Sequence, residues 1–185
     1  MSRLNITVDT WDPLTGLDRG TLRTVWIRAA NKAIAKAKTQ ASKLVRAEYF
    51  LKAEDMRNVL KVYRAKPSDL TAALRARSRR LSLARFQVRQ KAAGVQVRVK
   101  RSGRGDVLAH TFLSVLPLSR LQVRSREGKG RYPTIQHTGP SPADLIGSEE
   151  IFVRLDASVR DDMGTIYNHE LGFELQRQGQ KAPRK

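Results

Sequence analysis

The sequence predicts an α+β fold in which a long N-terminal helix packs on a mostly antiparallel sheet, with another helix near the C-terminus. Two observations support this class. Helix-forming segments come first, and a run of short alternating segments separates them from the last helical segment. The chain has 185 residues, 40% of them hydrophobic, which suits one core. We expect an N-terminal strand-like arm over residues 1–18, a single α+β domain over 19–177, and a polar tail over 178–185.

The N-terminal part predicts one short strand and one long helix. Apolar residues alternate with polar ones over residues 4–8, and a turn at residues 11–13 ends this strand. Residues 21–47 contain no glycine or proline and are rich in alanine. They predict a helix of about seven turns, capped by Asp18 or Thr21.

The long predicted helix has two distinct faces at 100° per residue. The wide face carries small and apolar residues that suit packing: Leu22, Trp26, Ala29, Ala33, Ala37 and Leu44. A narrow basic stripe lies beside it: Arg28, Lys32, Lys36, Lys43 and Arg46. A solvated face is the favoured interpretation of this stripe, and a binding site is the alternative.

Residues 81–100 predict a β-hairpin around which the domain is organised. Alternating residues flank a turn that Ala92, Ala93 and Gly94 can form, with glycine free to adopt positive φ. One face is apolar and includes Phe86, which we expect in the core. The opposite face is basic, and it is either a solvated surface or a contact for an anionic partner. Four cations are expected on this one side: Arg85, Arg89, Arg98 and Lys100.

The remaining segments predict a mixture of short elements and a last helix. They are a short helix (54–60), a strand (70–76), a central strand ended by Pro117 (107–116), a strand from Leu121, a polar loop (124–131), a capped helix entry (139–144) and a final helix (155–176). The apolar face of the final helix is expected to contain Val159, Met163, Ile166 and Phe173.

The charge of the chain is strongly positive and unevenly distributed. Thirty-six Lys and Arg residues against 17 Asp and Glu give a net charge of +19. Residues 70–105 contain 11 basic residues and no acidic one, whereas residues 144–185 carry a net charge of −2. Such a chain suits a nucleic acid, an anionic surface or an acidic protein. The polarity also favours head-to-tail contacts between subunits, unless each region only solvates its own face.

The sequence contains no recognisable catalytic or ligand-binding motif. There is no cysteine, and His110, His137 and His169 are not spaced as a helical metal site. Phosphate-binding and nucleophile motifs are also absent from the sequence. We therefore expect no enzyme activity, no metal and no cofactor. The first residues lack the apolar core of a signal peptide, and we expect no membrane segment.

Three groups of motifs resemble the phage minor tail protein Z family, which contains tail completion proteins of long-tailed bacteriophages and prophages. The segment AANKAIAKAKTQASKLVRAEY matches the family's basic, alanine-rich opening helix. The second match is Arg85-Phe86, Arg89-Gln90 and Gly94-Val95; the third is Pro133 and Ile135 followed by Gly139-Pro140-Ser141. The family-motif residues with an expected structural role are Phe86, Gln90, Gly94, Gly139, Pro140 and Ser141.

The resemblance implies a structural virion protein at the head-proximal end of the tail. There it would form a homo-oligomeric ring, of six subunits because the related tails are sixfold, and act in tail completion and head–tail joining. Its implied partners are other tail and connector proteins, with non-specific contact to DNA in the channel. It would occupy the neck of the virion and the host cytoplasm during assembly. A small basic DNA-binding or packaging protein, or a head–tail adaptor, is the alternative.

Overall fold

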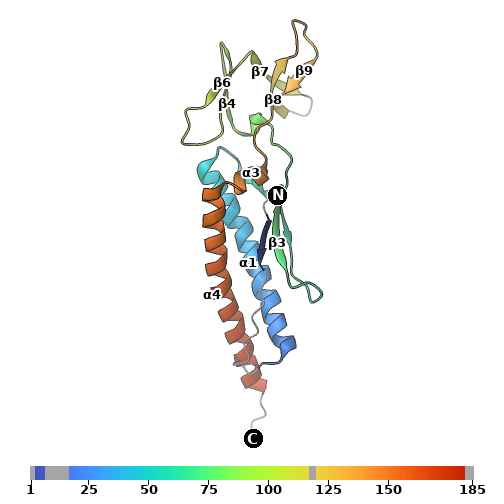
Figure 1. The fold of residues 1–185 in the computed structure, drawn as a ribbon, viewed down its shortest axis with the longest axis vertical. Helices are drawn as coiled ribbons and strands as arrows, with labels where there is room; N and C mark the ends of the chain where they lie inside the picture. Colours follow the sequence, from blue (N-terminus) through green and yellow to red (C-terminus); the bar gives the residue numbers. More distant parts are fainter. Residues whose placement is uncertain (1–2, 7–16, 117–119, 182–185) are drawn as a thin grey trace. The chain divides into compact units, whose positions relative to one another are not determined.

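The described residues of this computed structural model form two compact units with an α+β composition (Figure 1). The described stretches are residues 3–6, 17–116 and 120–181. Unit 1 lies within residues 42–59 and 76–148, and unit 2 lies within residues 2–41, 60–75 and 149–185. The predicted fold class is confirmed, with a long N-terminal helix, antiparallel sheets and a C-terminal helix. The turn expected at residues 11–13, the strand end at Pro117 and residues 182–185 lie outside the described residues.

Helix α1 (Arg19–Glu48) confirms the predicted long helix. Its first turn is capped by Asp18, whose Oδ2 accepts a hydrogen bond from the Thr21 backbone N–H at 3.0 Å. The predicted packing face is buried, except that Leu44 is half-buried. Alanines on this face allow close approach of neighbouring elements, as the alanine-rich sequence predicted.

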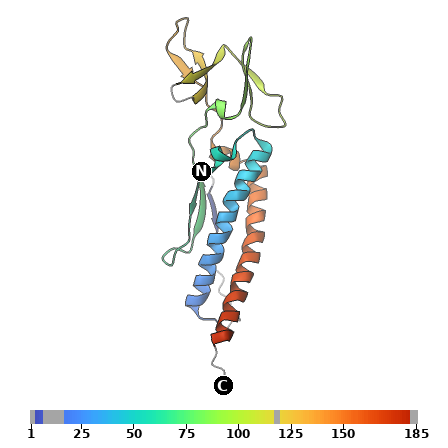
Figure 2. The ribbon, with the colours of Figure 1, turned by 180° about the vertical axis from the view of Figure 1, so that it is seen from behind.

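Unit 2 places the first part of α1 beside a small sheet and helix α4 (Glu149–Lys181), and Figure 2 shows the two helices side by side. The sheet contains strands β1 (Arg3–Ile6), β2 (Leu60–Tyr63) and β3 (Ala72–Ala76) in the order β1-β3-β2. The Trp26 indole N–H donates to the Leu70 carbonyl at 3.1 Å. The Asn31 amide pairs with both backbone groups of Ala65, at 3.1 and 2.8 Å.

Helix α4 is longer than the sequence predicted. It includes residues 149–154 and 178–181, and the latter were expected in a polar tail. Residues 178–181 are Gln, Gly, Gln and Lys, and because Gln and Lys are good helix formers the helix continues through them. Its core side includes Val159 and Met163, as predicted, but Phe173 is 55% exposed, so its expected burial is wrong. Three residues before Phe173, Glu170 is buried. Its partner there is Lys32 of α1, so an ion pair and not an apolar contact forms at this part of the helix.

Unit 1 contains the predicted hairpin as strands β4 (Gln87–Lys91) and β5 (Gly94–Arg98), paired antiparallel. The first strand begins later than predicted, because residues Leu83–Arg85 form the 3-10 turn η2. In that turn, the Arg85 N–H donates to Ser82 and the Phe86 N–H donates to Leu83. The hairpin belongs to the sheet β4-β5-β6, separate from the sheet beside Trp26 and Asn31. The hairpin therefore does not belong to the antiparallel sheet that lies beside α1.

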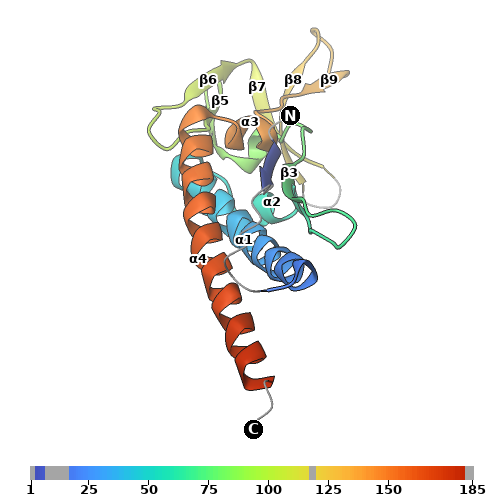
Figure 3. The same cartoon turned by 60° about the horizontal axis from the view of Figure 1, so that its bottom comes forward.

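The predicted central strand over residues 107–116 is two edge strands. Strand β6 (Asp106–Ala109) ends at His110, which has φ of 57°, and β7 (Thr111–Leu116) begins a second sheet. That sheet has the order β7-β8-β9, with β8 (Arg120–Arg126) and β9 (Thr134–Gln136), as Figure 3 shows. Residues 124–126 extend β8, so the predicted loop is shorter than expected.

Two short helices complete unit 1. Helix α2 (Ala53–Arg57) confirms the predicted short helix but ends before Leu60, which belongs to β2. Helix α3 (Pro142–Ile146) begins with the predicted capping box. The Ser141 hydroxyl accepts from the Asp144 N–H at 3.2 Å, and the Asp144 carboxylate accepts from the Ser141 N–H at 3.0 Å.

Candidate functional site

The four cations predicted on one face of the hairpin do not all lie on that face. Arg85 lies in η2 rather than on a strand, so it does not share the strand face of the other cations. Its guanidinium forms an ion pair of 2.6 Å with Asp55 of α2. The Asp55 side chain is only 4% exposed, and a buried carboxylate needs a cation or several hydrogen-bond donors. Arg85 is therefore first of all the counter-ion of a buried acid.

A hollow of about 370 Å³ opens beside this ion pair. Lys52, Asp55, Arg85 and Gln122 contribute to its wall, together with Ser82. The Ser82 hydroxyl is buried without a hydrogen-bond partner among the described residues. These groups are mainly donors, so the hollow could accept an anionic group.

Arg98 lies on β5 and stabilises the turn that follows this strand. Its guanidinium donates to the carbonyls of Gly103 and Arg101, at 3.1 and 3.3 Å, and to the Gln87 side chain at 3.3 Å. The same group lies 5.0 Å from the centre of the Phe50 ring. Arg98 is only half-buried, but most of its donors are already used inside unit 1.

Lys100 and its neighbour Arg101 pack on aromatic rings at the end of α1. The Lys100 ammonium lies 5.9 Å from the centre of the Tyr49 ring, and Tyr49 is buried. Arg101 caps α1, because its backbone N–H donates to Glu48 at 2.7 Å and its Nε donates to the Arg46 carbonyl at 2.9 Å. This capping role of Arg101 was not predicted from the sequence. The only local signal for it is a basic residue that follows a strand.

Arg89 is a predicted cation that packs on no described aromatic ring and remains available to a partner. In the antiparallel register, Gln87 is opposite Arg98, so Arg89 and Arg98 lie on the same face, as predicted. Arg89 is exposed, and Lys91 lies two residues further on the same strand face. Within the part of the chain that the structure describes, neither side chain has an ion pair. Arg89 and Lys91, here called the β4 cation pair, are the candidate partner-facing site.

The family-motif residues have structural roles in unit 1. Phe86 is 5% exposed, which confirms its expected burial. A Cβ atom on Gly139 would lie 2.9 Å from the Phe86 ring, so this position needs glycine. Gly94 has φ of 150°, and a Cβ there would lie 1.9 Å from the Leu108 carbonyl oxygen. These contacts hold the hairpin and the following strands together.

The polar motif residues connect strands and begin α3. The Gln90 amide donates to the Gly94 carbonyl at 3.2 Å and accepts from the Leu113 N–H at 3.0 Å, so it links β4 to β7. The Pro140 carbonyl accepts from the Leu81 N–H at 3.3 Å. Ser141 is the N-cap of α3.

The two units differ strongly in charge. Counted over the whole residue ranges, unit 1 has 19 basic and 6 acidic residues, a net charge of +13, and unit 2 has 17 basic and 11 acidic residues, a net charge of +6. The residues expected to meet a partner therefore belong to the more basic unit. A surface with this excess of positive charge favours anionic partners and opposes contact with another copy of itself.

Unit 2 neutralises most of the basic stripe of α1 within the chain. Three cations of the stripe pair with acids of α4: Arg28 with Glu174 at 3.2 Å, Lys32 with Glu170, and Lys36 with Asp162 at 2.5 Å. The solvated face that the sequence favoured is thus an interhelical polar seam for these three positions. These acids are less available to a neighbouring subunit than the sequence suggested.

None of the helices in the described ranges is long and apolar enough to cross a membrane. Among residues 3–6, 17–116 and 120–181, no three or more His, Asp or Glu side chains are grouped as metal ligands.

Comparison with known proteins identifies one family model, described as Prophage minor tail protein Z (GPZ), which matches residues 9–181. No curated protein and no solved structure matches the chain. The family match extends over both units, including the hairpin, the α3 entry and all of α4.

Proposed function

The chain belongs to the prophage minor tail protein Z family, and on this premise we propose that it completes the head-proximal end of a long phage tail and acts in joining head and tail. A structural role in a phage tail follows from the family itself. The observation that carries the finer proposal is the extent of the match, residues 9–181, because it includes both units rather than one shared element. We assign no reaction to the chain.

We propose that the subunits form a closed ring, of six copies if it follows the sixfold symmetry expected for such tails. In a head-to-tail ring, one surface of each subunit meets a different surface of the next. The β4 cation pair is a suitable basic surface. Exposed acids at the start and middle of α4, Glu149 and Asp161, are its suitable counterparts, because neither has an ion pair among the described residues.

The direct test of the tail role is electron microscopy of tails made with and without the protein. The proposal expects a ring at one end of complete tails and defective head joining without it. A protein that decorates tails as separate monomers would refute the ring. A protein found only on heads or on packaged DNA would support the adaptor or the DNA-packaging alternative instead.

Charge reversal tests the β4 cation pair without damaging the ion pair of Arg85. We expect Arg89→Glu with Lys91→Glu to give tails that fail to join heads, even heads without DNA, if the partner is protein. Failure restricted to DNA-filled particles would identify DNA as the partner. The control is Lys129→Glu, which reverses an exposed cation in the turn after β8. Normal joining and infectivity in all variants would show that this face is only solvated.

A further inference from the structure

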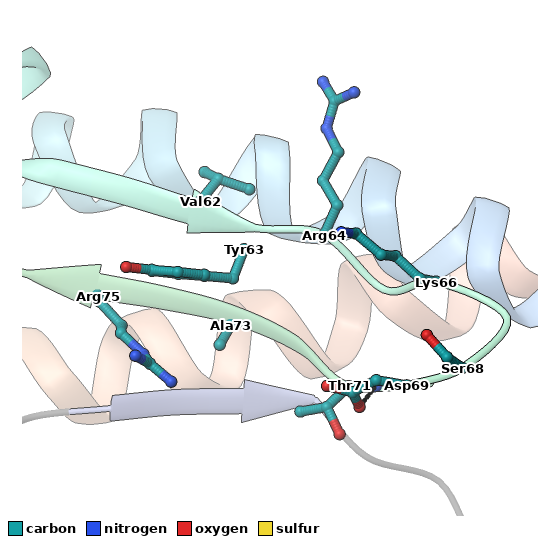
Figure 4. Close-up of a pocket in the computed structure, with 9 residues that line it drawn as sticks. All are labelled: Val62, Tyr63, Arg64, Lys66, Ser68, Asp69, Thr71, Ala73 and Arg75. Atoms are coloured by element: carbon teal, nitrogen blue, oxygen red, sulfur yellow. Dashed lines mark hydrogen bonds between the residues drawn. The ribbon is translucent and has the colours of Figure 1, made fainter.

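The outer face of the β2–β3 hairpin forms a groove in unit 2 that the tail role does not explain (Figure 4). The groove has a volume of about 700 Å³. Tyr63 and Arg75 line it from the strands, and Lys66, Ser68 and Thr71 line it from the connecting turn. Figure 4 shows Tyr63 and Arg75 next to each other on this face, with the helices behind the sheet.

The hairpin carries cations that have no acidic partner. Lys61, Arg64, Lys66 and Arg75 are exposed, and none of them forms an ion pair with any described residue. This distinguishes them from the α1 cations of the same unit, which α4 neutralises. The charge of the hairpin is therefore open to a ligand.

Among the described residues that line the groove, Asp69 is the one carboxylate, and it is already committed to the turn. Asp69 accepts a hydrogen bond of 2.9 Å from the Thr71 N–H. Hydrogen bonds from the backbone and side chain of Thr71 lower the pKa of Asp69 below its ordinary value, so the group stays ionised near neutral pH. Asp69 shapes the turn, and its single negative charge is fewer than the positive charges of Arg64, Lys66 and Arg75 in the groove.

An exposed aromatic ring is part of the same face. Tyr63 is 44% exposed, and the Arg75 guanidinium lies 4.4 Å from the centre of its ring. A cation against an aromatic face holds the ring in place. A fixed, exposed ring beside several cations is the combination that single-stranded nucleic acids use, since bases stack on aromatic rings while phosphates meet basic side chains.

We propose that this hairpin groove binds the backbone of single-stranded nucleic acid, with Tyr63 stacking on a base. Three cations, Arg64, Lys66 and Arg75, line the groove, which suits a polymer with an anion in each repeat. A small ligand with one carboxylate would instead need a few donors that converge on one point. The aromatic ring favours a nucleic acid over an acidic polypeptide, because the polypeptide has no base to stack.

The test measures binding of the purified full chain to a labelled oligothymidylate of about 20 nucleotides over a range of salt concentrations. Replacing Arg64 and Lys66 by Gln should reduce the slope of log K against log salt by about 1.4, or about 0.7 for each lost phosphate contact. Tyr63→Leu should weaken binding from about fivefold to more than a hundredfold. Unit 1 is unaltered in every variant, so any contribution of its cations to binding cancels and the difference isolates the hairpin groove.

The matched control replaces Arg154 and Arg160 by Gln, which removes two positive charges from the same unit on helix α4. The proposal expects this control to keep the salt slope of the unchanged protein. Equal slopes for the control and the Arg64/Lys66 variant would overturn it. Equal competition by polyglutamate, with no effect of Tyr63→Leu, would also overturn it and indicate an acidic protein. Because the assay needs no tails, its failure would leave the proposed tail role untouched.

Discussion

Phe86 provides the most direct test of how unit 1 is held together. Phe86→Ala removes a ring that is 5% exposed and in close approach to Gly139. Glycine has no side chain that could move into the vacated space, so the cavity should persist. Large-to-small substitutions of a buried Phe cost roughly 3–5 kcal/mol in free energy of unfolding. We expect a value within this range.

The assay is urea unfolding together with a thermal melt. For a chain of this size, each kcal/mol shifts the melting temperature by about 2–4 °C, so a fall of roughly 6–20 °C is expected. The matched control is Phe173→Ala on α4, which removes the same atoms from a side chain that is 55% exposed. The control should change stability by no more than about 0.5 kcal/mol. Equal shifts for the two variants would refute the burial argument.

Gly139 allows the same contact to be tested from its other side. Gly139→Ala should destabilise the protein, because the new Cβ would lie 2.9 Å from the Phe86 ring and 3.1 Å from the Leu83 side chain. In a Phe86→Ala background, the added methyl group should cost less, because the ring is gone. Strict additivity of the two free-energy changes would show that these residues do not meet.

Three further predictions concern polar contacts. Glu170→Gln should lower stability by about 1 kcal/mol, and less at high salt, because the Lys32 partner is largely exposed; urea unfolding at two salt concentrations measures this. The Ser141 hydroxyl and N–H lower the pKa of Asp144, so its stabilisation is complete above the unfolded-state pKa near 3.9 and is lost as pH falls through the lower folded value. Asp144→Asn should remove that acid sensitivity in melts below about pH 4. Arg101→Ala should cost about 1 kcal/mol and speed amide exchange in the last turn of α1; unchanged exchange there would count against its capping role.

The sequence predicts elements whose signals are local. The long helix, the β4–β5 turn at Gly94 and the capped start of α3 at Ser141 all follow from spacing and from one or two residue types. Each can be predicted from its local signal alone, although distant contacts such as that of Trp26 with Leu70 also stabilise the folded elements. Local pattern therefore explains most of the secondary structure.

The errors arise where a distant partner decides. Arg85 alternates with apolar residues as a strand residue would, but the buried carboxylate of Asp55, thirty positions away, holds it in a turn. His110 adopts positive φ and divides what reads as one apolar strand. Phe173 has the spacing of a core residue, whereas the nearby buried position is taken by Glu170, which serves Lys32. A candidate site predicted only from the alternation of residues therefore includes cations, such as Arg85, that are already bonded within the protein.

The paired hydrogen bonds between Asn31 and Ala65 have a consequence for solubility. An edge strand normally displays free N–H and C=O groups that can recruit a strand from another molecule. The Asn31 amide occupies both groups of Ala65, just beyond the end of β2, as a neighbouring peptide would. The Asn31 side chain thus prevents another strand from pairing with the backbone of Ala65. Asn31→Leu should consequently increase aggregation at high protein concentration more than it lowers the melting temperature.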